Sequence, residues 1–383
     1  MIPHHADPAT EYRLSVASLL SDLGLVAEAR SLVAELAASD AFAAALALAV
    51  IDLGAGETER AAAGFERAAG LRPGSADAAL GRGLAELQAG RHAAASDALC
   101  LARMLGADEA ATALGIGEAA LAQGDLALAR AELERSLAAR PESVAPRLAL
   151  ARCLRASCDD RQAIVVLSDG LVHAPLDARL LLALAGVLEA TGDGAGARAV
   201  VSFPARELAS DDPDLIHAWA VLALRGGELD EARVAIARLE AAVQPTPEAC
   251  LELAKLCLVA RDHAAADRHL TICLAAMPDA AEAHYLRALL DAPHDAEAAR
   301  RELALALALE PGHWHAALVW AELALAGGDD ATASALVEHA ERRAGPVPEV
   351  VALRRSIRRH GEARAAARAT RTTTPDDEGT SFR

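Results

Sequence analysis

The sequence has almost no aromatic residues, a single lysine (Lys255) and no asparagine. Phe, Trp and Tyr together make up 2% of its 383 residues, although hydrophobic residues make up 53%. The apolar residues are therefore mostly Ala and Leu, which are strong helix formers. The aromatic and β-branched residues that strands favour are too sparse for a sheet protein. Composition alone thus predicts an all-α fold.

Short motifs of catalysis and phosphate binding are also missing. The chain contains no GxSxG, no HExxH and no Walker lysine in a Gly-rich loop. No segment outside the repeats described below is long enough to hold a separate enzyme domain. We therefore expect no catalytic residues and no enzymatic activity.

The six cysteines form no CxxC pair, which is typical of small buried residues in a reducing compartment. Two combinations could supply metal ligands: Cys250 with Cys257, and His269 with Cys273. Structural zinc sites usually show close ligand pairs in turns, and none occurs here. We expect neither a metal nor another cofactor.

A formal net charge of −18 disfavours binding to nucleic acid and to anionic membranes. The N-terminus lacks a basic segment followed by an apolar run, so no signal peptide is expected. The most apolar stretch, 42–53, has about half of the ~20 residues that a membrane span requires. These features predict a cytoplasmic protein without a membrane span, for which nucleic acid is not an expected partner.

A repeat of 34 residues runs through most of the chain. Alanines recur at this interval at Ala61, Ala95, Ala129, Ala163 and Ala197. A glycine stands a few residues before this position at Gly24, Gly56, Gly90, Gly124, Gly192, Gly227, Gly328 and Gly361. A proline closes the unit at Pro73, Pro141, Pro175, Pro278 and Pro311. A fixed period of this size predicts a solenoid of stacked repeats.

The pattern resembles the tetratricopeptide repeat, a helix–turn–helix unit of the same length. The small residues of that family at positions eight and twenty are present, for example, as Gly117 and Ala129, and its large apolar residue at position twenty-four as Leu133. The resemblance covers roughly 10–347 and implies a right-handed α-solenoid of about ten repeats with a C-terminal capping helix. The repeats begin near Thr10, Phe42, Ala76, Ala110, Val144, Ala178, Pro213, Pro247, Ala281 and Trp314.

Several repeats begin with a helix-capping signal. Ser75, Asp212 and Thr246 each precede a predicted first helix, where a side-chain oxygen can accept a hydrogen bond from a free backbone N–H. Asp279 and Glu282 have the spacing of a capping box.

One repeat departs from the pattern, because Pro204 lies inside its second predicted helix and the turn-like linker 210–214 follows. This segment is either a discontinuity between two half-solenoids or a local kink. The expected organisation is a flexible N-terminus (1–9), an N-terminal array (10–212), a C-terminal array (213–347), a basic capping helix or helix pair (348–369) and a disordered tail (370–383).

In the family that the pattern resembles, the first helix of each repeat lines a concave binding groove. Mapped onto this chain, the expected groove is apolar in the N-terminal half and mixed in charge later. Its candidate residues are Leu46, Val50, Leu53, Leu80, Leu84, Leu87, Leu114, Leu121, Leu148, Arg152, Arg155, His217, Leu251, Lys255 and Tyr285. Such a stripe suits an amphipathic helix or an extended peptide of another protein. The alternative is that neighbouring repeats bury much of it.

The family's carboxylate clamp uses lysines and asparagines, so this chain cannot build it in its usual form. A variant made of arginines around Arg152, Arg155 and Arg179 stays open. A second candidate surface is the basic face of the C-terminal helix, formed by Arg354, Arg355, Arg358 and Arg359. It would contact an acidic partner, a membrane surface or nucleic acid, but a solvated cap of the solenoid is the favoured interpretation.

Three functions remain from the sequence. The first is a non-catalytic scaffold or adaptor that binds a partner protein in its groove. The second is a regulatory or substrate-presenting subunit of an enzyme complex whose catalytic chain is separate. The third is a homotypic assembly protein, since the end faces of a solenoid can stack on one another.

Overall fold

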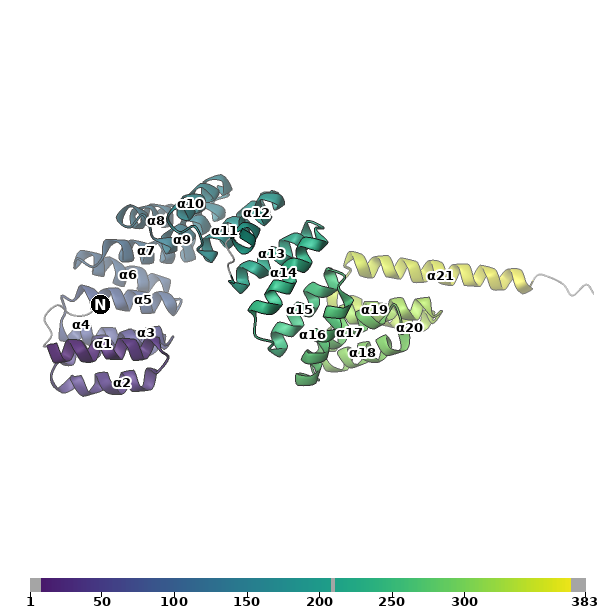
Figure 1. Cartoon of the computed structure of the whole chain (residues 1–383), viewed down its shortest axis with the longest axis horizontal. Helices are drawn as coiled ribbons and strands as arrows, with labels where there is room; N and C mark the ends of the chain where they lie inside the picture. Colours follow the sequence, from purple (N-terminus) through teal and green to yellow (C-terminus); the bar gives the residue numbers. More distant parts are fainter. Residues whose placement is uncertain (1–7, 208–210, 373–383) are drawn as a thin grey trace, which may run out of the picture. The chain divides into compact units, whose positions relative to one another are not determined.

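The structure, a computed structural model, describes residues 8–207 and 211–372, and these ranges contain helices and no strand (Figure 1). The helices are α1 (Pro8–Asp22), α2 (Val26–Ala34), η1 (Glu35–Ala38), α3 (Ala41–Gly54), α4 (Thr58–Leu71), α5 (Ala76–Gln88), α6 (His92–Met104), α7 (Glu109–Gln123), α8 (Leu126–Ala139), α9 (Val144–Ala156), α10 (Asp160–His173), α11 (Ala178–Ala190), α12 (Gly194–Glu207), α13 (Pro213–Arg225), α14 (Leu229–Ala242), α15 (Pro247–Val259), α16 (His263–Ala276), α17 (Ala281–Asp291), α18 (Ala296–Leu309), α19 (Trp314–Ala326), α20 (Asp330–Ala344) and α21 (Pro348–Thr372). Within the described ranges, none of these helices is both long and apolar enough to cross a membrane.

The helices form ten successive pairs followed by α21, so the predicted all-α repeat solenoid is confirmed. We call the first helix of each pair helix A and the second helix B. Seven of the ten A helices begin at the residue that the repeat pattern predicted, and the other three begin within two residues of it. The seven starts are Ala76, Val144, Ala178, Pro213, Pro247, Ala281 and Trp314.

Three of the predicted caps are present. The Ser75 hydroxyl accepts from the Ala78 N–H (3.1 Å), and Asp212 and Thr246 cap α13 and α15 in the same way. The predicted capping box at Asp279 is wrong. The N-cap of α17 is Ala280, without a side-chain hydrogen bond, and Glu282 instead lies 2.9 Å from Nε2 of His313.

Nine of the ten turns between paired helices contain one residue in the left-handed region, and only the short turn 292–295 between α17 and α18 lacks it. Gly124 occupies this region with φ 81°, where a side chain would strain the backbone. Six of the other predicted turn glycines also have positive φ: Gly24, Gly56, Gly90, Gly192, Gly227 and Gly328. In two repeats without such a glycine, Cys158 and Arg261 adopt φ 58° at the equivalent position.

The residues that define the repeat lie where helices A and B cross. Ala129 and Leu133 of α8 are fully buried, together with the equivalent Ala61, Ala95, Ala163, Leu99 and Leu167 of neighbouring repeats. Four of them, Ala129, Leu133, Ala163 and Leu167, join a core cluster that includes Ala149 and Leu150 of α9. Small side chains at these crossings allow the two helices to approach closely, which explains why Ala can replace the aromatic residues of a conventional core.

The chain divides into two compact units, 1–208 and 209–383. Helix α12 continues past Pro204 to Glu207, and the Pro204 side chain is buried. At the other end, α21 is one continuous helix through Gly361 that packs on α19 and α20 (Figure 1). Val350 and Ile357 anchor it in the core of the last repeat. Residues 1–7 of the predicted flexible N-terminus and 373–383 of the predicted tail lie outside the described residues.

Candidate binding surface

The A helices form the inner side of the first unit. Successive A helices, from α1 through α3, α5, α7 and α9 to α11, contact one another directly. The backbones of successive B helices do not approach each other as closely in the described part of the chain, although Arg103 of α6 donates to Glu132 of α8 at 3.1 Å. Stacked pairs whose A helices approach more closely than their B helices curve toward the A side. This inner face therefore corresponds to the expected groove.

Two predicted groove residues prove to be core residues instead. Leu46 is 2% exposed and Leu80 is 3% exposed, so both are core residues that offer little surface to a ligand, although Leu46 borders the hollow between α1 and α3. The contact between successive A helices is the reason, because it covers the position from which these leucines project. Leu46 and Leu80 therefore follow the alternative given in the sequence analysis, in which neighbouring repeats bury the leucines of the stripe.

Other apolar members of the predicted groove are only partly covered by the neighbouring helices. Val50 is 42% exposed and lies in a hollow of about 300 Å³ between α1 and α3. The half-buried members are Leu53, Leu84, Leu87, Leu114, Leu121, Leu148 and Leu251. The inner face thus presents edges of leucine side chains rather than an open apolar stripe.

Three arginines and a glutamate surround one hollow of this face. The hollow, which we call the arginine pocket, has a volume of about 400 Å³. Arg152 and Arg155 come from α9, Arg179 from α11 and Glu118 from α7. Small and apolar side chains form the rest of the lining: Ala145, Leu148, Ala151, Leu167, Ala183 and Val187. Three consecutive A helices therefore bring together three predicted groove residues, Leu148, Arg152 and Arg155, and the third arginine of the proposed clamp variant.

The two arginines of α9 make only long ion pairs. Nη2 of Arg152 lies 3.5 Å from Glu118 Oε1, and Nε of Arg155 lies 3.7 Å from Asp160 Oδ1. Their side chains are 65% and 46% exposed. A guanidinium carries five N–H donors, so most of the donor capacity of both side chains faces solvent.

Arg179 is held more firmly than the other two. Its Nε and Nη2 donate to the Asp177 carboxylate at 3.2 and 2.7 Å, and Asp177 also caps α11. This hydrogen bond lowers the pKa of Asp177, and it raises the pKa of Arg179. Arg179 is therefore a fixed positive group at one edge of the arginine pocket.

Glu118 is the member of the pocket that sequence reasoning missed. Burial raises the pKa of its carboxyl group, and the charge of Arg152 only partly opposes this effect. Glu118 occupies position nine of its repeat, where the groove was expected, but only apolar residues were selected there in the N-terminal repeats. Treating position nine without regard to polarity would have found it.

The remaining predicted groove residues lie in the second unit. His217 of α13 is exposed, whereas Lys255 of α15 is paired with Glu252 at 2.9 Å and with Glu282 at 3.7 Å. Tyr285 of α17 is half-buried, with its ring 4.8 Å from that of His313. Lys255 and Tyr285 thus join a polar network around Glu282.

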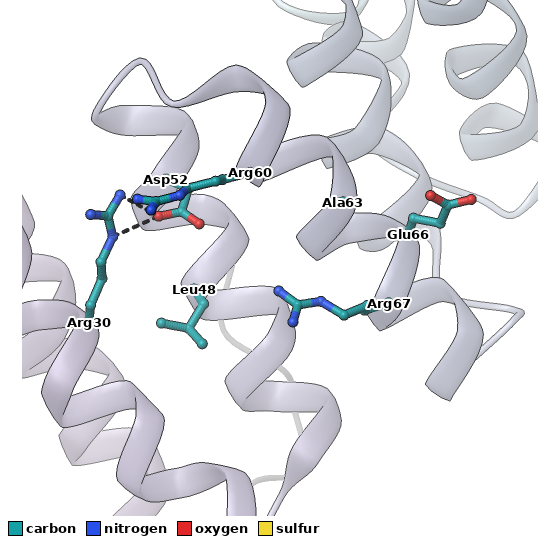
Figure 2. A pocket seen from close by; sticks show the side chains of 7 residues that line it. All are labelled: Arg30, Leu48, Asp52, Arg60, Ala63, Glu66 and Arg67. Atoms are coloured by element: carbon teal, nitrogen blue, oxygen red, sulfur yellow. Dashed lines mark hydrogen bonds and ion pairs between the residues drawn. The ribbon is translucent and has the colours of Figure 1, made fainter.

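A larger hollow of about 850 Å³ involves helix B side chains of α2 and α4 (Figure 2). Figure 2 shows the Arg30 guanidinium directed at Asp52, and Nε donates to this carboxylate at 2.7 Å. Asp52 is buried, so the pair fastens α2 of the first repeat to α3 of the second. Arg67 points across the hollow toward Leu48, and Glu66 points away from it. We interpret the Arg30–Asp52 pair as a structural contact between repeats.

The basic face of α21 is exposed at all four predicted positions. Two of its arginines are already paired: Nη1 of Arg354 with Glu341 at 2.9 Å, and Nε of Arg358 with Glu362 at 3.1 Å. Glu341 belongs to α20, so the first pair docks α21 on the repeat before it. This contact is what a capping helix requires.

The structure is that of a helical-repeat protein. Its helices are paired in register, small residues lie where they cross, and the inner face of the first unit contains hollows that could serve as a binding surface. A family model described as the tetratricopeptide repeat matches residues 120–185. This match confirms the predicted tetratricopeptide repeats within residues 120–185. No curated protein matches the chain in sequence.

Solved structures with similar folds include other repeat proteins. A tetratricopeptide repeat protein from Parabacteroides merdae is 15% identical, with 66% of this chain and 100% of that chain covered and a TM-score of 0.48. PilW, described as a widely conserved type IV pilus biogenesis factor, is 22% identical, with 54% and 96% covered and a TM-score of 0.48. YrrB, described as a protein with an unusual peptide-binding site, is 16% identical, with 51% and 97% covered and a TM-score of 0.39.

Proposed function

We propose that the chain is a non-catalytic scaffold that binds an acidic segment of a partner protein at the arginine pocket. The observation that carries this proposal is the pair Arg152 and Arg155. They lie one helical turn apart on α9, their side chains are 65% and 46% exposed, and the carboxylates beside them lie at 3.5 and 3.7 Å. With Arg179, they surround a hollow of about 400 Å³.

The charge of these side chains selects the partner. Three arginines meet at the pocket, although the chain as a whole has a net charge of −18. Asp177 holds Arg179 at 2.7 Å, whereas Arg152 and Arg155 have only distant carboxylates beside them, so these two guanidinium groups are the ones that an acidic partner would engage. Arginine matches carboxylates with two parallel hydrogen bonds, which gives direction as well as attraction. The partner's acidic side chains or its C-terminal carboxylate would replace the long contacts to Glu118 and Asp160.

The shape of the hollow favours an extended peptide over a helix. Apolar contact on this face is limited to the exposed edges of leucines such as Leu148, because these side chains are half-buried. A helix in a groove needs a continuous apolar stripe for its anchors. An extended acidic segment needs only a few directed charge contacts and small side-chain pockets.

Co-purification from the native host tests this function. Full-length chain carrying Arg152→Glu with Arg155→Glu should lose the proteins that co-purify with the unchanged chain. The matched control is Arg161→Glu, an exposed arginine of α10 that does not line the pocket. Identical sets of co-purifying proteins for all three chains would reject the arginine pocket as the binding surface.

A further inference from the structure

The second unit brings a glutamate, a cysteine and a histidine together from three consecutive helices. Glu240 lies near the end of α14, Cys257 on α15 and His269 on α16. One ligand atom from each side chain lies within 4.8 Å of the other two. We propose that these three residues form a structural zinc site, with Glu240, Cys257 and His269 as protein ligands.

The chemistry of the three side chains suits this ion. Zn²⁺ is bound by thiolate, imidazole and carboxylate at about 2.0–2.3 Å, in tetrahedral geometry. Ligand atoms on such a tetrahedron lie roughly 3.5 Å apart, so side-chain movements of about 1 Å would close the site. Hard ions such as Mg²⁺ and Ca²⁺ prefer oxygen ligands only, and the cysteine disfavours them.

His269 faces the other two side chains through its Nε2. This nitrogen lies 2.6 Å from Glu240 Oε1, so Nε2 is the ring atom that can share an ion with Glu240. A zinc ion would bind Nε2 and Glu240 in place of this hydrogen bond, and the ring proton would then reside on Nδ1.

The surroundings provide room for a fourth ligand. Glu240, Cys257 and Asp262 line a cavity of about 150 Å³, and a water molecule occupies about 30 Å³ in the liquid. Cys257 is fully buried, whereas the Glu240 side chain is 28% exposed, so the site is open to solvent at one edge. A water molecule at that edge would complete a tetrahedral zinc ion.

The charge of the cavity is also compatible with a divalent ion. Two arginines and one further carboxylate, Asp262, line it, and Arg233 lies 3.3 Å from Asp230. The Glu240 carboxylate and the Cys257 thiolate then neutralise Zn²⁺. When the ion binds, the thiol proton is released to solvent and the sulfur–metal bond takes its place.

Neither pair of ligands considered from the sequence corresponds to this site. Cys250 and Cys273 lie in the core cluster between α15, α16 and α17, away from Glu240. The three proposed ligands are separated by 17 and 12 residues in the sequence. They become neighbours in space because the B helices α14 and α16 flank the A helix α15. A zinc ion there would fasten α14, α15 and α16 together.

Cobalt titration tests the proposal, because Co²⁺ replaces Zn²⁺ in such sites and reports thiolate ligation by its charge-transfer absorption. The protein is the reduced full-length chain with Cys100→Ser and Cys158→Ser, which removes the two exposed cysteines. We expect one equivalent of Co²⁺ to produce the thiolate band and Zn²⁺ to abolish it. No band, or a band unaffected by Zn²⁺, would overturn the proposal.

Variants assign the ligands. In the same background, Cys257→Ala and His269→Ala should abolish the thiolate band, whereas Cys273→Ala, another fully buried cysteine, should retain it. Glu240→Gln changes a partly exposed side chain without changing its shape, so this variant should fold even if the variants of buried residues fold poorly. It should weaken Co²⁺ binding by about tenfold or more. A band of full strength in Cys257→Ala, or unchanged affinity in Glu240→Gln, would contradict the assigned ligands.

Discussion

At the scale of single residues, the absence of side-chain volume at helix crossings sets the geometry of each repeat. Gly64 of α4 packs directly on Ala49 of α3: a Cβ atom at Gly64 would lie 2.8 Å from the Ala49 Cβ and 3.2 Å from its Cα. The second contact is to backbone, which cannot rotate away. Helices A and B of this repeat would have to separate to admit even one methyl group.

Comparing two glycines of the same helix tests this interpretation. Gly64→Ala should leave the chain less stable than Gly70→Ala by about 1–3 kcal/mol, because an added methyl group at Gly64 overpacks the crossing. A Cβ atom at Gly70 would have no other atom within 4 Å, so this position reports the helix propensity gained by alanine without the clash. Chemical denaturation of both variants measures the difference, and equal stability would mean that the crossing tolerates the methyl group.

The residues of the crossings and turns could be predicted from the sequence because the repeat imposes the same geometry ten times. Leu46 and Leu80 could not be assigned correctly, because their burial depends on how closely successive A helices approach. Gly361 matches the turn pattern, yet α21 continues through it. Within a helix a glycine costs only about 1 kcal/mol relative to alanine, so a turn needs a further packing partner to form there.

At the scale of elements, charged contacts between A helices form the candidate binding site. Glu118 of α7 and Arg152 of α9 are joined by a 3.5 Å ion pair across neighbouring repeats. Burial raises the pKa of Glu118 despite this partner, so the ionised carboxylate is less stable in the folded chain than in water. The spacing of the repeats predicted that α7 and α9 are neighbours, but not the burial that perturbs Glu118.

The raised pKa of Glu118 has a consequence for stability. A carboxyl group whose pKa is higher in the folded state binds protons more tightly there, so stability falls as the pH rises from about 4.5 through the folded-state pKa. The Glu118→Gln variant has no carboxyl group to ionise at this position. At pH 7 the variant should therefore melt at a higher temperature than the unchanged chain. The gap between them should shrink toward pH 4.

Thermal melts at several pH values, with Glu142→Gln as the control at an exposed glutamate of the same unit, measure this effect. A Glu118→Gln variant that is less stable than the unchanged chain at pH 7 would show that the Arg152 ion pair outweighs the cost of burial.

At the scale of the whole molecule, a strongly acidic chain gathers three arginines around one hollow on the inner face of its first unit. The net charge of −18 opposes the approach of an acidic partner over long distances, and salt screens this repulsion. Binding must then come from short-range contacts with arginines. The sequence predicted the repeat fold and the candidate arginines, whereas only the structure shows that Arg152, Arg155 and Arg179 surround one hollow.

The most direct test of this account is the affinity of the full-length chain for a short acidic peptide with a free C-terminal carboxylate, measured by calorimetry. The unchanged chain should bind this peptide and should not bind its uncharged glutamine counterpart. Arg152→Ala and Arg155→Ala should each weaken binding by about tenfold, as expected for arginines at the centre of an interface, while Arg161→Ala should leave it unchanged. Equal binding of the acidic peptide by the unchanged chain and by the variant lacking both arginines would contradict the assignment of the arginine pocket as the partner site.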